Sequence, residues 1–133
     1  MSVNEHPPQP GDQPLVWIVD CEQWPRANLC AELIERGYDT VGYLALGPVL
    51  SALRWTSTPK PLVLVLDLHG QSVIEADFEK LAAGKIPVVL VAGSVELQHP
   101  GVAVGQWAAV LKRPITLGEI ADVVERIISG SGH

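Results

Sequence analysis

Cysteine, basic runs and long apolar stretches are all scarce in this chain, and each scarcity excludes a class of protein. No apolar run approaches the ~18 residues of a membrane span, and the N-terminus carries no signal-peptide pattern. We therefore expect a soluble, cytoplasmic protein with no membrane partner. Net charge is −6, and no stripe of lysine or arginine could follow a phosphate backbone, so we expect no direct nucleic-acid partner.

The two cysteines, Cys21 and Cys30, are predicted to stay reduced. Cys21 sits at an expected strand end, whereas Cys30 lies a turn or more into the next expected helix. A phosphate-cradling loop is also missing. The segment from Asp20 to Arg26, which follows the first apolar run, has no glycine and two acids, and this argues against a flavodoxin-type or nucleotide-binding enzyme.

What is present indicates one packed domain. Hydrophobic residues make up 47% of the 133 residues and charged residues 18%, which fits a globular core of single-domain size. Residues 1–14 hold four prolines and one aliphatic side chain, so we expect a disordered leader. The glycine and serine residues of 129–133 predict a flexible tail. The domain is therefore expected over residues 15–128.

Short apolar runs alternate with segments of helical periodicity, which is typical of a parallel sheet covered on both faces. The pattern predicts an α/β fold, a single doubly wound (βα)₅ domain. The expected strands are residues 15–19, 38–44, 62–66, 86–91 and 108–111. The expected helices begin near Pro25, Pro48 and Val73, and a last one follows Thr116.

The helical pattern is clearest at the end of the chain and weakest before the fifth strand. Residues 116–119, Thr-Leu-Gly-Glu, form a capping-box sequence, and apolar residues then recur at helical spacing to Ile128. By contrast, the segment from Ser94 to Gln106 contains Pro100 and two glycines and has no sustained apolar stripe. The fourth helix is therefore predicted to be short or irregular.

Charged residues close three of the expected strands. Asp20 follows the first apolar run, Asp67 follows the third, and Arg113 follows the fifth. In doubly wound sheets, ligands bind beyond the carboxyl ends of the strands, where the strand order reverses. We therefore expect these two acids and one cation to share a site.

At these positions the chain resembles a known family. Residues 19–22, Val-Asp-Cys-Glu, with Arg26 following, resemble the acidic motif of the receiver domains of two-component response regulators. Residues 65–68, Val-Leu-Asp-Leu, are similar to the family's phosphoacceptor motif, and residues 113–115, Arg-Pro-Ile, to its Lys-Pro motif. The resemblance covers Leu15 to Ile128 and implies a flavodoxin-like strand order, 2-1-3-4-5, and a cis Arg113–Pro114 peptide.

The resemblance implies phosphoryl transfer to a carboxylate, with Mg²⁺ neutralising the charge. Asp67 would accept the phosphoryl group from a histidine kinase, and Asp20, Asp67 and the backbone carbonyl of His69 would bind Mg²⁺. Mg²⁺ prefers oxygen ligands, so the adjacent Glu22 is a further candidate. A module of this kind is not an enzyme with a small-molecule substrate; at most it catalyses phosphoryl transfer to its own Asp67.

Four positions depart from the family pattern. Cys21 stands where a second acid would bind the metal, and a thiol is a poor ligand for Mg²⁺. Arg113 replaces a lysine, and its planar fork does not reproduce a compact ammonium. Ala92 lacks the expected hydroxyl, and Val110 replaces the aromatic switch residue. Any Mg²⁺ binding should therefore be weak.

Two mechanisms stay open on the sequence alone. In one, a histidine kinase phosphorylates Asp67 with weak dependence on Mg²⁺. In the other, which the four departures favour, the pocket is vestigial and the domain binds an output protein, or a second copy as a homodimer, without phosphate. A direct bond between Arg113 and Asp67 would occupy the metal position and indicate a locked pocket.

Overall fold

The computed structural model describes residues 13–55 and 57–130. Most of the predicted disordered leader and the last three residues lie outside this range. Pro14, the last residue of the predicted leader, lies inside it, and its carbonyl accepts a hydrogen bond of 2.9 Å from the N–H of Asp39. The predicted tail begins too early, because Ser129 and Gly130 belong to the last helix.

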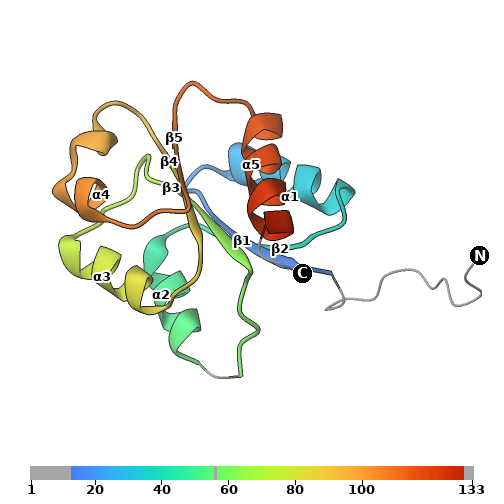
Figure 1. Cartoon of the computed structure of the whole chain (residues 1–133), viewed down its shortest axis with the longest axis horizontal. Helices are drawn as coiled ribbons and strands as arrows, with labels where there is room; N and C mark the ends of the chain where they lie inside the picture. Colours follow the sequence, from blue (N-terminus) through green and yellow to red (C-terminus); the bar gives the residue numbers. More distant parts are fainter. Residues whose placement is uncertain (1–12, 56, 131–133) are drawn as a thin grey trace, which may run out of the picture.

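Five parallel strands form one sheet (Figure 1). Their order is β2-β1-β3-β4-β5, which confirms the predicted doubly wound fold and strand order. The strands are β1 (Leu15–Val19), β2 (Asp39–Tyr43), β3 (Val63–Asp67), β4 (Val88–Ala92) and β5 (Ala109–Lys112). The predicted strands 62–66 and 108–111 each begin and end one residue earlier than β3 and β5. Asp67 is therefore the last residue of β3, and it pairs with Val91.

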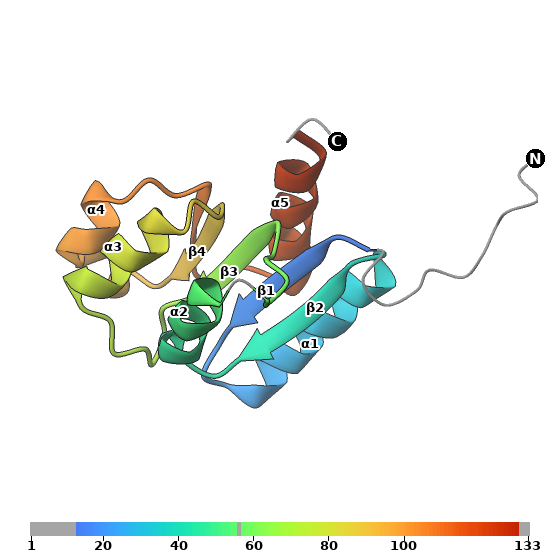
Figure 2. The same ribbon diagram turned by 90° about the horizontal axis from the view of Figure 1, so that it is seen from below.

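Helices cover both faces of the sheet, as Figures 1 and 2 show. One face carries α1 (Gln23–Glu35) and α5 (Leu117–Gly130). The other carries α2 (Leu46–Arg54), α3 (Glu75–Ala83) and the short α4 (Pro100–Val104). None of the helices in residues 13–55 and 57–130 combines the length and the apolar character of a membrane span.

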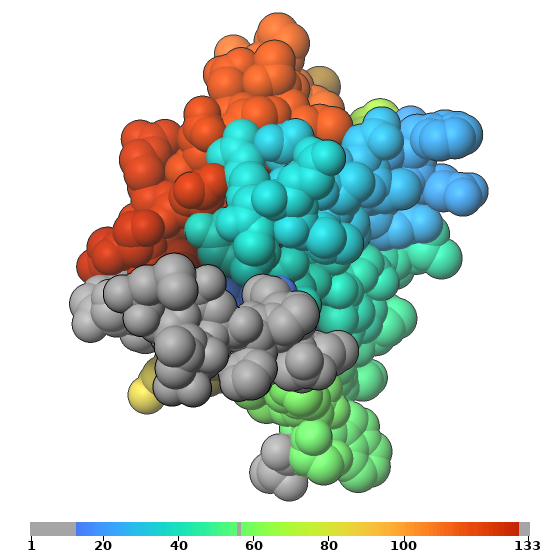
Figure 3. Space-filling view, turned by 90° about the vertical axis from the view of Figure 1, so that its right-hand side faces the viewer, coloured from blue at the N-terminus to red at the C-terminus, as the bar shows by residue number. Residues whose placement is uncertain are grey.

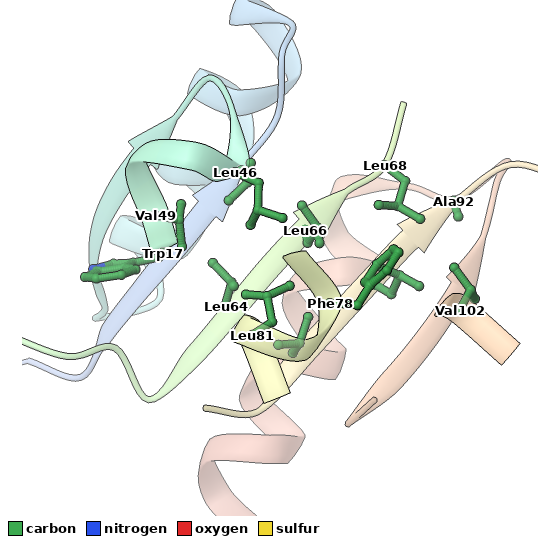
Figure 4. Close-up of a cluster of buried hydrophobic side chains, with 13 residues drawn as sticks. Trp17, Leu46, Val49, Leu64, Leu66, Leu68, Phe78, Leu81, Ala92 and Val102 are labelled. Carbon is green, nitrogen blue, oxygen red and sulfur yellow. The ribbon is translucent and has the colours of Figure 1, made fainter. Parts of the chain in front are cut away.

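Alternation along the strands divides the core into two layers. Trp17 and Val19 of β1 point to the α2, α3 side, where Trp17 lies at one end of a hydrophobic cluster that extends past Leu64 to Phe78 (Figure 4). Val16 and Ile18 point to the α1, α5 side. Helices cover both faces of β3 and β4, so apolar side chains of these strands can point in either direction. All eight residues of Val63–Leu66 and Val88–Val91 are buried.

One arginine at the end of α1 links α1 to α5 through ion pairs. Arg36 lies between Asp122 and Glu125 of α5, with N···O distances of 2.7 and 2.9 Å, and also pairs with Glu32. The hydrogen bonds that Arg36 donates, the one to Asp122 first, raise its already high pKa further. Figure 3 shows this face, with α1 in blue to cyan directly against α5 in red.

The start of α5 confirms the predicted capping box. The Thr116 hydroxyl accepts a 3.1 Å hydrogen bond from the N–H of Glu119, and the Glu119 carboxylate accepts one from the N–H of Thr116. The irregular fourth helix is also confirmed. Only a single 3₁₀ turn at Glu96–Gln98 and the five residues of α4 form there.

Helix α4 stays in place through its contacts with α3. The Nδ1 of His99 accepts a 3.0 Å hydrogen bond from the N–H of Gly101 and caps the helix. The ring of Phe78 packs edge to face against His99 and Trp107, with centroids 5.1 and 5.5 Å apart. Gly101 is buried on this ring, and a Cβ added there would overlap it. The backbone of α4 therefore lies as close to Phe78 as glycine allows.

This contact predicts that Gly101→Ala destabilises the protein. The new methyl group would push the buried ring of Phe78, and overpacking of this kind costs about 1–3 kcal/mol of unfolding free energy. Gly47→Ala in α2 is the matched control, because a Cβ there meets nothing within 4 Å and alanine favours a helix. Urea unfolding measures both. Equal or greater stability of Gly101→Ala would contradict the close contact.

Candidate functional site

Two buried acids lie side by side at the carboxyl edge of the sheet. Asp20 follows β1 directly and Asp67 ends β3, and the two strands are paired there through Val19 and Leu66. Asp20 and Asp67 are 6% and 4% exposed, and they are the buried charged residues in the part of the chain that the structure describes. Burial of a carboxylate is costly without a partner, so the neighbours of each decide what this site can do.

The predicted cation is bonded to Asp67. Arg113 follows β5, and its guanidinium donates from Nη2 to Oδ2 of Asp67 in a direct ion pair. The Arg113 N–H donates to the carbonyl of Ala92 at 2.9 Å, and the Arg113–Pro114 peptide is cis, as predicted. The other Asp67 oxygen, Oδ1, accepts from the N–H of His69 at 3.0 Å. Both oxygens of the candidate phosphoacceptor are therefore engaged by the protein itself.

Asp20 is held by its own turn. Its Oδ1 accepts from the N–H of Glu22 at 2.9 Å, and its backbone carbonyl accepts from Nη1 of Arg26 at 2.7 Å. The stem of Arg26 also lies over Gly42 of β2, where a Cβ would come within 3.1 Å of it. Arg26 thus links the turn after β1 to the neighbouring strand, and these contacts position the Asp20 carboxylate.

Cys21 makes a contact that the sequence did not indicate. Its thiol donates to the backbone carbonyl of His69 at 3.2 Å, and this is the oxygen that the resemblance assigned to Mg²⁺. The loop comes this close because Gly70 has φ +71°, and a Cβ at Gly70 would lie 2.6 Å from the sulfur. In the sequence, the one available indication of this contact was the glycine after His69.

Glu22, the further metal candidate, points to the rim of the site. Its side chain is 57% exposed, and its carboxylate lies 3.7 Å from Nε2 of His69. No cluster of three or more histidine, cysteine or acidic side chains is arranged to hold a metal ion in residues 13–55 and 57–130. With Asp67 paired to Arg113 and the His69 carbonyl bonded to a thiol, the donors as arranged do not fit Mg²⁺.

The two remaining altered positions lie on neighbouring strands. Ala92 is fully buried at the end of β4, beside Lys112 in register, and brings no hydroxyl to the edge. Val110 of β5 is 46% exposed and lies beside Leu90. An aliphatic side chain at Val110 has no ring that could turn between the surface and the pocket.

Comparisons with known proteins support the fold and leave the roles of the residues open. No protein-family model matches the sequence, and no curated protein matches it. Among solved structures, a receiver domain of response regulator 1452 from Francisella superposes with a TM-score of 0.71 at 19% identity, covering 89% of this chain and 98% of that one.

Two further structures agree. The N-terminal domain of a response regulator, sensory box and GGDEF protein from Carboxydothermus hydrogenoformans has a TM-score of 0.71 at 13% identity, covering 90% of this chain and 99% of its own. A response regulator receiver protein from Pseudomonas putida has a TM-score of 0.69 at 23% identity, covering 86% and 97%. The chain has the receiver-domain fold. In this receiver fold, Asp20, Asp67 and Arg113 all lie at the carboxyl edge of the sheet.

The contact between Cys21 and the His69 loop predicts the effect of a substitution at Gly70. Gly70→Ala should lower the unfolding free energy by about 1–3 kcal/mol, because alanine at positive φ is strained and its Cβ overlaps the Cys21 sulfur. Adding Cys21→Ala should recover part of that loss, since it removes the overlap and leaves the backbone strain. Urea unfolding of both variants measures this, and no recovery would contradict the contact.

The ion pair predicts strong coupling between Arg113 and Asp67. Arg113→Ala should destabilise the protein by about 1–3 kcal/mol at neutral pH, because it leaves a buried carboxylate without its charged donor. Combining it with Asp67→Asn should cost less than the sum of the two single changes. Chemical unfolding of the four proteins measures the coupling, with exposed Lys112→Ala as the control. Additive effects would show that the pair contributes nothing.

Proposed function

We propose that this domain is an atypical receiver-like signalling module that binds protein partners in a phosphate-independent way. The observation that carries the proposal is the ion pair between Arg113 and Asp67. The guanidinium takes the place beside the carboxylate that a bound cation would need. The module works as a docking or dimerisation domain in a two-component-type pathway, and its partner is an output protein or a second copy of the chain.

The state of Asp67 supports this reading. A carboxylate that attacks phosphorus needs a free oxygen lone pair and nearby positive charge that neutralises the incoming phosphoryl group. Here one oxygen is bonded to the N–H of His69 and the other to Arg113. Each oxygen keeps a second lone pair, but attack on phosphorus would weaken the hydrogen bond that the attacking oxygen already accepts, and no set of free donors is arranged nearby to hold a metal ion.

The neighbouring strands lack the parts that would transmit phosphorylation. Resemblance to receivers assigns this task to a hydroxyl at the position of Ala92 and to an aromatic ring at that of Val110. A methyl group and an aliphatic side chain occupy them instead. A partner of this domain therefore recognises one fixed conformation of the surface.

One observation supports a second candidate function. Asp67 is a buried carboxylate at the end of β3, at the switch point of the sheet, beside Asp20. This is the place that the family resemblance gives to a phosphoacceptor. A conventional phosphorelay receiver, phosphorylated on Asp67 by a histidine kinase with weak Mg²⁺ dependence, is the alternative that the experiment must separate.

An amide NMR titration with Mg²⁺, then with Mg²⁺ and beryllofluoride, separates the two. We expect no saturable shift at Asp20, Asp67 or Arg113 up to about 10 mM metal, because no free set of oxygen ligands is available. Saturable shifts in the wild type that vanish in Asp67→Asn would overturn the proposal in favour of a working phosphoacceptor.

A gain-of-function variant tests the cause. Cys21→Asp with Arg113→Lys restores an acid and a compact ammonium at the two positions that close the pocket. This double variant should show saturable Mg²⁺ shifts where the wild type shows none. If the double variant also fails to bind, then Cys21 and Arg113 are not what prevents metal binding.

A further inference from the structure

The short α4 leaves a groove open beside α3. Two adjoining hollows of about 450 and 400 Å³ share Phe78, Ala82, Gly105 and Gln106, so they form one continuous groove along the helix. Figure 1 shows α3 and α4 on the same side of the sheet, and the groove runs between α3 and the segment from α4 into β5.

The groove has an aromatic floor and an apolar rim. Phe78 and Trp107 line it, and the Trp107 indole is fixed by a 2.9 Å hydrogen bond from Nε1 to the carbonyl of Val102. Gly105 has no side chain to cover that indole, and a Cβ there would lie 2.6 Å from it. Val104, on the rim, is 81% exposed, the highest value of any large apolar side chain in the described residues. This is a surface that an apolar side chain of a partner could fill.

The two ends of the groove carry opposite charges. Glu75 and Glu79 lie four residues apart on α3 and line one end, and neither carboxylate has a salt-bridge partner within residues 13–55 and 57–130. Lys85, just after α3, lines the other end. A helix places partial positive charge at its N-terminus and negative charge at its C-terminus. The groove therefore matches a helix that runs parallel to α3.

We propose that this groove binds an amphipathic helix of a partner protein, apolar on one face and with lysine or arginine near its N-terminal end. Apolar side chains of the helix contact Phe78, Val104 and Trp107, the basic residues pair with Glu75 and Glu79, and the C-terminal end lies near Lys85. The net charge of −6 also favours a basic partner through long-range attraction. The inference rests on the proposed docking function and names the surface and the partner chemistry.

A pair of capped peptides of about 16 residues tests the proposal, a length at which an amphipathic sequence can form a helix. Both carry the same leucine stripe; one has lysines in its N-terminal half and the other has glutamates there. NMR titration of the labelled full chain should show saturable shifts at Phe78, Val104 and the Trp107 indole with the basic peptide, and binding at least about fivefold weaker with the acidic one. Equal binding of the two would overturn the charge assignment.

Matched variants locate the site. Val104→Glu and Glu79→Lys should each weaken binding of the basic peptide by at least about fivefold. Val95→Glu and Glu35→Lys should leave it unchanged, because these two exposed residues lie outside the groove. Spin labels on the peptide ends should broaden signals near Glu75 from the N-terminus and near Lys85 from the C-terminus. The reverse pattern, or equal losses in the control variants, would overturn the proposal.

Other outcomes assign the groove differently. Concentration-dependent shifts at Val104 and Trp107 without peptide would show that a second copy of the chain fills the groove, which would overturn the proposed partner. Absence of any peptide binding would overturn the inference and leave the proposed function standing. Saturable Mg²⁺ and beryllofluoride shifts at Asp67, by contrast, would refute the phosphate-independent function whatever the peptides do.

Discussion

Burial of the sheet on both faces is the constraint on which the rest of this structure depends. The central strands, which helices cover on each side, must be apolar up to their ends, and β3 and β4 are buried throughout. Polar chemistry is then confined to the strand ends, where the chain meets water. Because all the strands are parallel, their carboxyl ends meet at one edge, and Asp20, Asp67 and Arg113 gather there.

At that edge, one of the two buried carboxylates is paired with a cation of the protein itself. A pocket that holds two buried carboxylates has an excess of negative charge, which favours a cation. In this chain the guanidinium of Arg113 provides that cation to Asp67, and Asp20 accepts a backbone N–H. The thiol of Cys21 meanwhile bonds the carbonyl of His69. Asp67, Asp20 and the His69 carbonyl thus each accept a hydrogen bond from another residue of the same edge.

The surface beside α3 is shaped by the short α4. With α4 reduced to five residues, Phe78 packs with His99 and Trp107, and two glycines bring the backbone close to these rings. The sheet remains covered, but the surface beside α3 keeps a groove with charged ends. The proposed docking function rests in part on this surface and on the aliphatic side chains of Ala92 and Val110.

Some features of this structure could be predicted from the sequence and others could not, for physical reasons. Strand and helix order, the capping box at Thr116 and the broken helix near Pro100 depend on local periodicity and backbone chemistry, so the sequence itself determined them. The same holds for the convergence of Asp20, Asp67 and Arg113, which follows from strand ends and topology. Only the tertiary structure decided that Arg113 bonds Asp67, that Cys21 bonds the His69 carbonyl, and that a groove opens beside Phe78. Those contacts join residues distant in the chain, and no local pattern records which side chains meet.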